Sequence, residues 1–323
     1  MNALSMLLKT LWQLKVRHNP VILSHTINAG CNLSCAFCPY SKLRGGEMST
    51  REVKLLLSEA REMGVMVYNV WATEPLMRAD LPECLDYAKS LGMTTSMITN
   101  GLLLEERVDE LVDVVDFLSV SLDGIECYEE LRGADVQDVL NGVRAARQRG
   151  MGVLLNCVIN ERNLDELGGL VFLAHELGCT ISFEPVAEYE QIPKSTWDVL
   201  GIRSYERYER AIDELVELKR RGFPIMNSYT YLNMIKTLKP AFRCHVDELF
   251  LHVGLDGKVV CCRERGLELG RVSDGLKSVW QHSRQRRKEI SSTCEGCLSF
   301  GYAESSMALG GNIEVMRSYG RYL

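Results

Sequence analysis

Three cysteine residues near the start of the 323-residue chain have a spacing that suits metal chemistry. Cys31, Cys35 and Cys38 form the pattern C-x3-C-x2-C and follow an apolar stretch, residues 21–27. Iron–sulfur clusters are normally held by four cysteine thiolates. Three thiolates at this spacing would hold three irons of a [4Fe–4S] cluster and leave the fourth iron open to a small molecule. The pattern therefore predicts a cluster that takes part in chemistry.

A second group of cysteines, in the last third of the chain, has the spacing of another metal site. Its members are Cys244, Cys262, Cys294 and Cys297. Gly257 is expected to turn a hairpin whose second strand brings Cys262 back toward Cys244. Cys261 competes with Cys262, but adjacent strand residues point to opposite faces, so one of them is expected to bind metal. The spacing from Gly257 favours Cys262, and it leaves the choice between zinc and iron–sulfur open.

Composition narrows the class of protein. A net charge of −6 argues against non-specific binding to nucleic acid. Twelve cysteines are many, but they are too few for a disulfide scaffold, and no export signal precedes them. Paired cysteines in such a chain indicate metal ligands, and a cytoplasmic location is expected. No apolar run approaches the roughly 20 residues that a membrane-spanning helix needs.

Apolar strand-like segments alternate with helical patterns through the first two thirds of the chain. This rhythm predicts a parallel sheet with right-handed crossovers, in the form of a partial (βα)6 barrel of α/β class. The six strands are expected at 21–27, 65–70, 94–98, 117–121, 153–159 and 181–186. The helices are expected at 50–63, 81–91, 105–112, 136–149, 164–177 and 203–221, the first opened by a capping box of Ser49 and Glu52.

The pattern changes near residue 227. A hairpin at 249–262, a helix at 276–290 and a short strand at 224–226 are expected around this change. We therefore expect three parts: an N-terminal helix over 1–20, the partial barrel over 21–226, and a small C-terminal α+β iron–sulfur domain with its tail over 227–323.

Polar residues recur where the predicted strands end. In parallel barrels, functional residues gather at this edge. The residues concerned are Glu74, Asn100, Ser121, Asp123 and Glu184. They lie at the ends of four strands or in the loops that follow, with Ser121 and Asp123 from the same strand, and on the same side as the front cysteines, so we interpret them as parts of one site.

Over residues 21–186 the chain resembles the radical S-adenosylmethionine (SAM) enzymes. The resemblance rests on the front cysteines and on Glu74-Pro75, which is similar to the end of that family's Gly-Gly-Glu-Pro motif. It implies that SAM binds the open iron and that Glu74 meets the amino group of SAM. Ser121 and Asp123 would contact the ribose or methionine portion. The two glycines of the motif are Ala72 and Thr73 here, a departure that could crowd the methionine backbone.

The same resemblance implies further contacts to SAM and a reaction. Phe37 would pack near the adenine, and Asn100 and Glu184 would be further contacts. A one-electron reduction of SAM would give methionine and a 5′-deoxyadenosyl radical, which takes a hydrogen atom from a substrate. An electron donor such as ferredoxin or flavodoxin is implied. The substrate could be a peptide, a sugar-like alcohol or another metabolite.

The C-terminal cysteines resemble those of the twitch domain, a shortened SPASM domain found in many relatives. The likeness implies an auxiliary [4Fe–4S] cluster that accepts an electron, and so two clusters in all. No general base is identified. The alternative hypothesis is a non-catalytic metal-binding or scaffold protein that retains the fold.

Two basic or amphipathic segments remain open to interpretation. Leu4, Leu7, Leu8 and Leu11 have helical spacing, with Trp12 beside them and basic residues after them. A helix packed across the bottom of the barrel is favoured over one lying on a membrane surface. A basic run, residues 284–288, is interpreted as a solvated helix face rather than a docking site for an acidic partner.

Overall fold

The strands predicted in the first two thirds of the chain form one curved parallel sheet. The computed structural model describes residues 3–319. Strands β1 to β6 lie side by side in sequence order, and every neighbouring pair is parallel. Their bounds are β1 Ile22–Thr26, β2 Val67–Trp71, β3 Thr94–Thr99, β4 Phe117–Ser121, β5 Val153–Ile159 and β6 Thr180–Pro185. The predicted partial barrel is confirmed, because the sheet curves without closing on itself.

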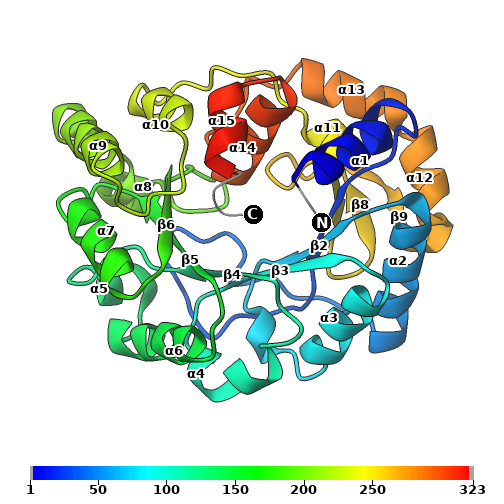
Figure 1. Cartoon of the computed structure of the whole chain (residues 1–323), viewed down its shortest axis with the longest axis horizontal. Coiled ribbons are helices and arrows are strands. Elements are labelled where there is room, and N and C mark those ends of the chain that lie inside the picture. The colour runs from blue at the N-terminus through cyan, green and yellow to red at the C-terminus, as the bar shows by residue number, and fades with distance from the viewer. Residues whose placement is uncertain (1–2, 320–323) are drawn as a thin grey trace.

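Helices between the strands cover the outer, convex face of this sheet (Figure 1). They are α2 Thr50–Met63, α3 Leu81–Ser90, α4 Leu104–Arg107, α6 Val136–Gln148 and α7 Leu167–Glu176. The predicted capping box at α2 is confirmed: Ser49 N donates to Glu52 Oε2 at 2.8 Å, and Glu52 N donates to Ser49 Oγ at 3.3 Å. The inward positions Val53, Leu56 and Leu57 of α2 are fully buried, which fixes the helix on the sheet.

Some helical segments differ from the expected lengths. The helix predicted over 105–112 is only the four-residue α4 followed by a 3₁₀ turn, Val108–Glu110. The strand predicted at 224–226 reduces to a single bridge between Ile181 and Ile225. Short helices α5 Tyr128–Arg132, α8 Lys194–Leu200 and α10 Tyr229–Lys236 were not predicted, whereas α9 Tyr205–Arg220 was. These three helices have five to eight residues, so they offer little periodicity to recognise.

The C-terminal third extends the same sheet. After α11 Val246–Leu249, strand β7 Phe250–Val253 lies parallel against β1, and β8 Lys258–Val260 and β9 Glu268–Arg271 follow in antiparallel order. The predicted hairpin is confirmed, with Gly257 in the left-handed conformation at φ 79°. The division of the chain near residue 227 stays a prediction.

One long helix was expected over 276–290, and this expectation is wrong. The segment forms two helices, α12 Leu276–His282 and α13 Arg284–Ser292, separated at Ser283. The Ser283 hydroxyl donates to Trp280 O at 3.3 Å and accepts from Arg287 Nε at 3.2 Å. Such local side-chain bonds compete with the regular helix ladder. Arg287 is buried rather than solvated, because its guanidinium stacks on the Trp280 ring at 3.4 Å.

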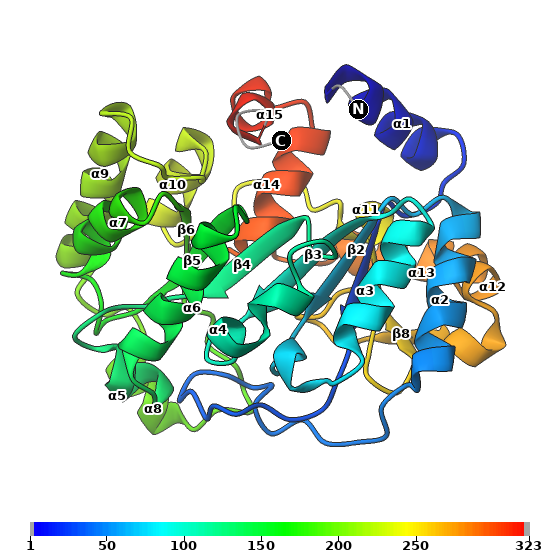
Figure 2. The same ribbon diagram turned by 60° about the horizontal axis from the view of Figure 1, so that its bottom comes forward.

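The chain ends in two further helices, α14 Phe300–Leu309 and α15 Ile313–Tyr319, on the concave side of the sheet (Figure 2). Glu304 of α14 is fully buried, and its Oε1 accepts from Ser228 N at 2.7 Å, the residue before α10. Burial raises the pKa of Glu304 to about 7. Its other oxygen, Oε2, has no hydrogen-bond partner.

Glu304 is expected to make the stability of the fold depend on pH. Because its pKa is raised in the folded state, the folded state binds the proton more tightly. The free energy of unfolding should therefore fall between about pH 4.5 and pH 7 and level off above that. Glu304→Gln keeps an acceptor for Ser228 N and removes the ionisation. Urea unfolding at several pH values should show a flatter profile for this variant, and an unchanged slope would contradict the assignment.

The N-terminal helix forms as predicted, but its packing differs from the expectation. Helix α1 spans Ala3–Lys15. Gln13 and Leu14 pack against the body of the protein, whereas Leu8 and Trp12 are 59% and 60% exposed. The prediction that this helix packs its apolar stripe across the barrel is therefore wrong for the part whose side chains are described. Over residues 3–319 no helix combines the length and apolar character needed to cross a bilayer.

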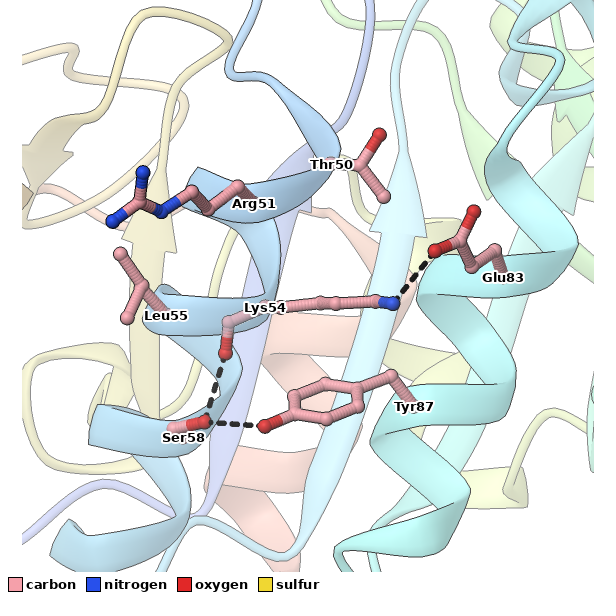
Figure 3. Close-up of a pocket in the computed structure, with 7 residues that line it drawn as sticks. All are labelled: Thr50, Arg51, Lys54, Leu55, Ser58, Glu83 and Tyr87. Atoms are coloured by element: carbon pink, nitrogen blue, oxygen red, sulfur yellow. Dashed lines mark hydrogen bonds and ion pairs between the residues drawn. The ribbon is translucent and has the colours of Figure 1, made fainter.

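A shallow hollow on the outer surface lies between α2 and α3 (Figure 3). Lys54 Nζ donates to Glu83 Oε1 at 2.6 Å across it, and the Ser58 and Tyr87 hydroxyls are 2.9 Å apart. These polar groups bind one another across the helix pair. The hollow is lined only by residues of these two helices, and none of the predicted site residues is among them.

Candidate functional site

The three front cysteines share one loop between β1 and α2, and all are partly buried. The pKa of Cys35 is raised to about 11, mainly by burial; Arg132 opposes this rise, whereas the nearby Cys38 and Cys31 contribute to it. The thiols are thus close enough to interact electrostatically. Among residues 3–319, however, no group of three His, Cys, Asp or Glu side chains stands in a metal-binding arrangement. A bound metal would have to draw the three sulfurs together.

The chemistry of these donors fits an iron–sulfur cluster. Cysteine ligands bind as thiolates, so metal binding displaces the protons that burial holds on the sulfurs. Three thiols on one loop, without a fourth cysteine in that loop, match the open-iron arrangement that the spacing predicts. Cys31, Cys35 and Cys38 would hold the cluster.

A buried ion pair lies directly behind the cysteine loop. Arg132 Nε donates to Asp123 Oδ2 at 2.6 Å, and their side chains are 8% and 0% exposed. Asp123 Oδ1 also accepts from Val158 N at 2.8 Å, which ties the loop after β4 to β5. The Arg132 Nη1 atom lies 3.9 Å from Cys35 Sγ. Burial disfavours the charge of Arg132, but Asp123 and Cys35 outweigh it and hold the pKa of Arg132 above its ordinary value.

Arg132 is a residue that sequence reasoning missed. Its guanidinium lies 5.5 Å from the centre of the Phe37 ring, so it contacts both the cysteine loop and Asp123. It lies in α5, whose five residues are too few for a helical period to be recognised from sequence. Arginine side chains are mostly exposed in proteins, so the sequence gives no reason to expect a buried one here. The role of Arg132 as the partner of Asp123 becomes visible only in the structure, where Asp123 is fully buried.

Glu74 connects the ends of β2 and β3. Its fully buried carboxylate accepts from Thr99 Oγ1 at 2.7 Å, from Asn100 N at 2.7 Å and from Leu76 N at 3.0 Å. Burial raises the pKa of Glu74, and these three hydrogen bonds oppose the rise. The carboxylate therefore holds two loops together, and the expected contact with SAM stays a prediction.

Asn100 reaches from this network to the front cysteines. Its Nδ2 donates to Asn32 Oδ1 at 2.7 Å and lies 3.7 Å from Cys31 Sγ. Glu74, Asn100 and Cys31 thus come from three separate segments of the chain and meet at one edge of the sheet. This is the edge where the sequence places the candidate site.

Ala72 and Thr73 keep the backbone shape that a glycine pair would allow. Their φ angles are 63° and 49°, in the left-handed region that costs an ordinary residue about 1–2 kcal/mol. The Thr73 hydroxyl donates to Asn28 Oδ1 at 3.0 Å, and Asn28 Nδ2 donates to Glu74 O at 3.0 Å. These bonds connect Thr73 and Glu74 to Asn28, and the turn before Glu74 keeps its left-handed shape although neither residue is glycine.

Three other predicted contacts have different surroundings. Phe37 is buried in a small cluster with Leu131, Trp197 and Leu200. Glu184, at the end of β6, accepts from Phe300 N at 2.9 Å and so binds the start of α14. Ser121 ends β4 beside Asn156 of β5 and is partly exposed.

Small polar side chains line the concave face of the sheet. The strand register places Ser24, Asn69 and Ser96 in one row across β1, β2 and β3. Ser121, Asn156 and Ser182 form a second row across β4, β5 and β6. Apolar residues such as Leu23 on the alternate positions face the helices. The concave face therefore carries hydrogen-bonding side chains, of which Ser182 and Asn156 bind each other at 2.8 Å.

The four C-terminal cysteines lie near one another, although they come from three segments. All four are partly buried. Burial raises the pKa of Cys262 to about 11 and that of Cys297 to about 12, and the charge of Cys244 adds to both shifts. Cys294 likewise raises the pKa of Cys244, after burial. Cys261 is more deeply buried than Cys262, at 2% exposure. This donor set, too, fits a metal that displaces thiol protons.

A single arginine joins this second group of cysteines to the concave face. Arg263, directly after Cys262, lies between the rings of Trp71 and Tyr302, at 4.8 and 5.0 Å from their centres. Its Nε donates to Glu264 Oε1 at 2.8 Å, and Glu264 Oε2 accepts from Tyr189 OH at 3.0 Å. Trp71 ends β2, immediately before Ala72. The sequence analysis did not single out Arg263, although its position next to a predicted ligand is a usable signal.

Comparisons with known proteins agree with this arrangement. The family model described as the radical SAM superfamily matches residues 26–174. The AdoMet-dependent heme synthase of Methanosarcina barkeri is 32% identical, and the alignment covers 88% of this chain and 93% of that protein. A probable GTP 3′,8-cyclase of Saccharolobus islandicus is 28% identical over 82% of this chain and 89% of that protein.

A solved structure shows the same fold at lower sequence identity. The crystal structure of Streptococcus suis SuiB bound to S-adenosylmethionine superposes with a TM-score of 0.68. The match covers 86% of this chain and 70% of that chain, at 16% identity. Both the curved sheet and much of the C-terminal region therefore belong to an architecture that is already known.

Proposed function

The chain belongs to the radical SAM superfamily, and on that premise we propose that it cleaves SAM reductively and removes a hydrogen atom from a substrate. The observation that supports this most is the meeting of Cys31 with Asn100, whose backbone is held by Glu74. A cluster and SAM bound there would supply one-electron cleavage of the C–S bond, giving methionine and a 5′-deoxyadenosyl radical.

The residues of this chain would orient SAM and keep water away from it. Asn100, whose Nδ2 lies 3.7 Å from Cys31 Sγ, and Ser121, at the end of β4, would offer polar groups to SAM. Glu74 fixes the loop that carries Asn100, and Asp123 with Arg132 fixes the back of the cysteine loop. Phe37 and Glu184 are weaker candidates for contacts, because packing and α14 already occupy their side chains.

We assign the second cysteine group to an auxiliary [4Fe–4S] cluster that accepts an electron from the substrate radical. Arg263 supports this assignment, because it packs on Trp71 at the SAM end of β2 and follows Cys262. A positive charge beside a cluster favours the reduced form. A ferredoxin or flavodoxin would supply the electron that starts the reaction.

A small metabolite is the substrate class that we favour. The two curated relatives are named for a haem synthase and a GTP cyclase, and each alignment spans nine tenths of the relative or close to it. Rows of serine and asparagine on the concave face suit a polar molecule of limited size. A peptide substrate is the alternative, and it would be supported by turnover of a peptide but of no metabolite.

Anaerobic reconstitution tests the proposed reaction. The purified chain is loaded with iron and sulfide and then incubated with SAM and dithionite, and 5′-deoxyadenosine is measured by chromatography. Formation of this product, increased by a metabolite substrate, is the expected result. A chain that carries well-formed clusters and yet never cleaves SAM would instead support the scaffold hypothesis.

The choice between the neighbouring cysteines has a direct test. Cys262→Ala is expected to lower the iron content by about four atoms per chain, because a cluster loses one of its ligands. Cys261→Ala is the matched control and should keep its iron. Iron and labile sulfide are counted after anaerobic reconstitution. Retention of iron by the Cys262 variant and its loss by the Cys261 variant would reverse the assignment.

A further inference from the structure

We propose that α1, together with the basic surface of α12 and α13, binds the surface of an anionic lipid bilayer. The proposal is independent of the reaction proposed above. It begins with an unusual concentration of exposed apolar side chains. Of the thirteen large apolar residues that are exposed in the described part of the chain, four lie within nine residues: Leu8, Leu11, Trp12 and Val16. Scattered apolar residues need no explanation, but a contiguous patch marks an interaction surface.

Leu8, Leu11 and Trp12 share one side of α1, because they stand at positions i, i+3 and i+4 of a helix with 3.6 residues per turn. Val16 follows in the turn directly after the helix ends. Gln13 and Leu14 lie on the opposite side, and they attach the helix to the body. Gln13 Nε2 donates to Met63 O at 2.7 Å, and Leu14 packs in a cluster with Val21. The apolar stripe therefore points away from the protein. Figure 2 shows α1 at the margin of the molecule.

The charge around this stripe favours an anionic partner. The chain as a whole carries −6, yet α1 and the turn after it contain Lys9, Lys15 and Arg17 and no acidic residue, although Lys15 pairs with Glu248 at 3.0 Å. Neighbouring helices add positive charge near α1. Trp280 Nε1 of α12 donates to His18 O at 2.9 Å, which places α12 beside the end of α1. The exposed basic side chains of α12 and α13 are Lys277, Arg284, Arg286 and Lys288.

A bilayer fits this combination better than a protein partner does. An interfacial helix buries an apolar stripe with tryptophan at the headgroup level, while flanking lysine and arginine meet acidic lipids. Trp12 stands in the middle of the stripe, and Lys9 and Arg17 are exposed on either side of it. The helix is far too short to span a bilayer, so the predicted attachment is peripheral.

Vesicle binding tests the proposal with the full-length, anaerobically purified protein. Vesicles of phosphatidylcholine with phosphatidylglycerol are compared with vesicles of phosphatidylcholine alone, by co-sedimentation. We expect binding to the anionic vesicles that weakens as salt increases. Tryptophan emission should shift to shorter wavelength at the same time. Trp12 would report this shift, because the other three tryptophans are at most 7% exposed.

Two sets of variants separate the apolar and the charged contributions. Leu8→Ser with Trp12→Ser should weaken binding by at least about tenfold. Arg284→Gln with Arg286→Gln and Lys288→Gln should weaken binding to anionic vesicles by about fivefold for each charge removed. Leu55→Ser is the matched control, because Leu55 of α2 is 54% exposed and lines the hollow between α2 and α3. It should bind like the parent protein.

Several outcomes would overturn the proposal. They are absence of binding, equal binding to both kinds of vesicle, and an unchanged affinity of the Leu8/Trp12 variant. Light scattering is the further measurement: a dimer that the Leu8/Trp12 variant converts to a monomer would show that a second copy covers the stripe. Formation of 5′-deoxyadenosine by each variant verifies folding and is not expected to change, so failure of the membrane proposal is distinguishable from failure of the proposed reaction.

Discussion

Replacing Cys31, Cys35 and Cys38 together with alanine is expected to reduce 5′-deoxyadenosine formation to the level without enzyme. These three residues are all the cysteines of the loop between β1 and α2. Without them no protein group remains to hold the iron that SAM would bind. The iron content should fall by about four atoms per chain, since the auxiliary group is untouched.

The matched control for this variant is Cys179→Ala. Cys179 is a buried cysteine, 3% exposed, that belongs to neither group. This variant should keep its full iron content and its SAM cleavage, measured by chromatography after the same anaerobic reconstitution. Persistent SAM cleavage in the triple variant would show that the front thiols do not hold the reactive cluster, and the proposed function would then be abandoned.

Replacing Arg132 with methionine is expected to destabilise the fold by about 3–5 kcal/mol, because it leaves the Asp123 carboxylate buried without its partner. Asp123 is fully buried, and Arg132 Nε lies 2.6 Å from its Oδ2. Removal of the Arg132 charge should also affect the cysteine loop. Arg132 opposes the rise in the pKa of Cys35, so the variant should ionise Cys35 less readily and assemble its cluster more slowly.

Urea unfolding measures the effect on stability, with two comparison variants. Arg162→Met removes a surface pair, in which Arg162 lies 3.0 Å from Glu130 and both side chains are about half exposed, and it should cost less than about 1 kcal/mol. Arg132→Met combined with Asp123→Asn removes both charges and should recover part of the loss. An Arg132 variant as mild as the Arg162 variant would show that the buried pair adds nothing to the fold.

Local sequence patterns were sufficient for much of the architecture. The strands at 117–121 and 153–159 and the helix at 50–63 were predicted with their observed bounds. Each segment combines a clear periodicity of apolar residues with a recognisable start or end, such as the Ser49 N-cap of α2. The prediction was wrong at 276–290, where the hydrogen bonds of Ser283 and Arg287 divide the helix. These hydrogen bonds depend on how Arg287 packs on Trp280, and the hydrophobic periodicity of the segment does not predict that packing.

The candidate site, too, has a part that the sequence predicted and a part that it did not. The sequence alone determined the two cysteine groups, because ligand type and spacing are local properties of the chain, and it placed the polar residues at strand ends because parallel strands share one edge. Only the tertiary structure decided that Arg132 neutralises Asp123, that Arg263 joins the second cysteine group to Trp71 on the concave face, and that the stripe of α1 faces outward. Each of these three features depends on which distant segments pack together and on how fully the packing excludes water from the side chains. A short stretch of sequence determines neither of them.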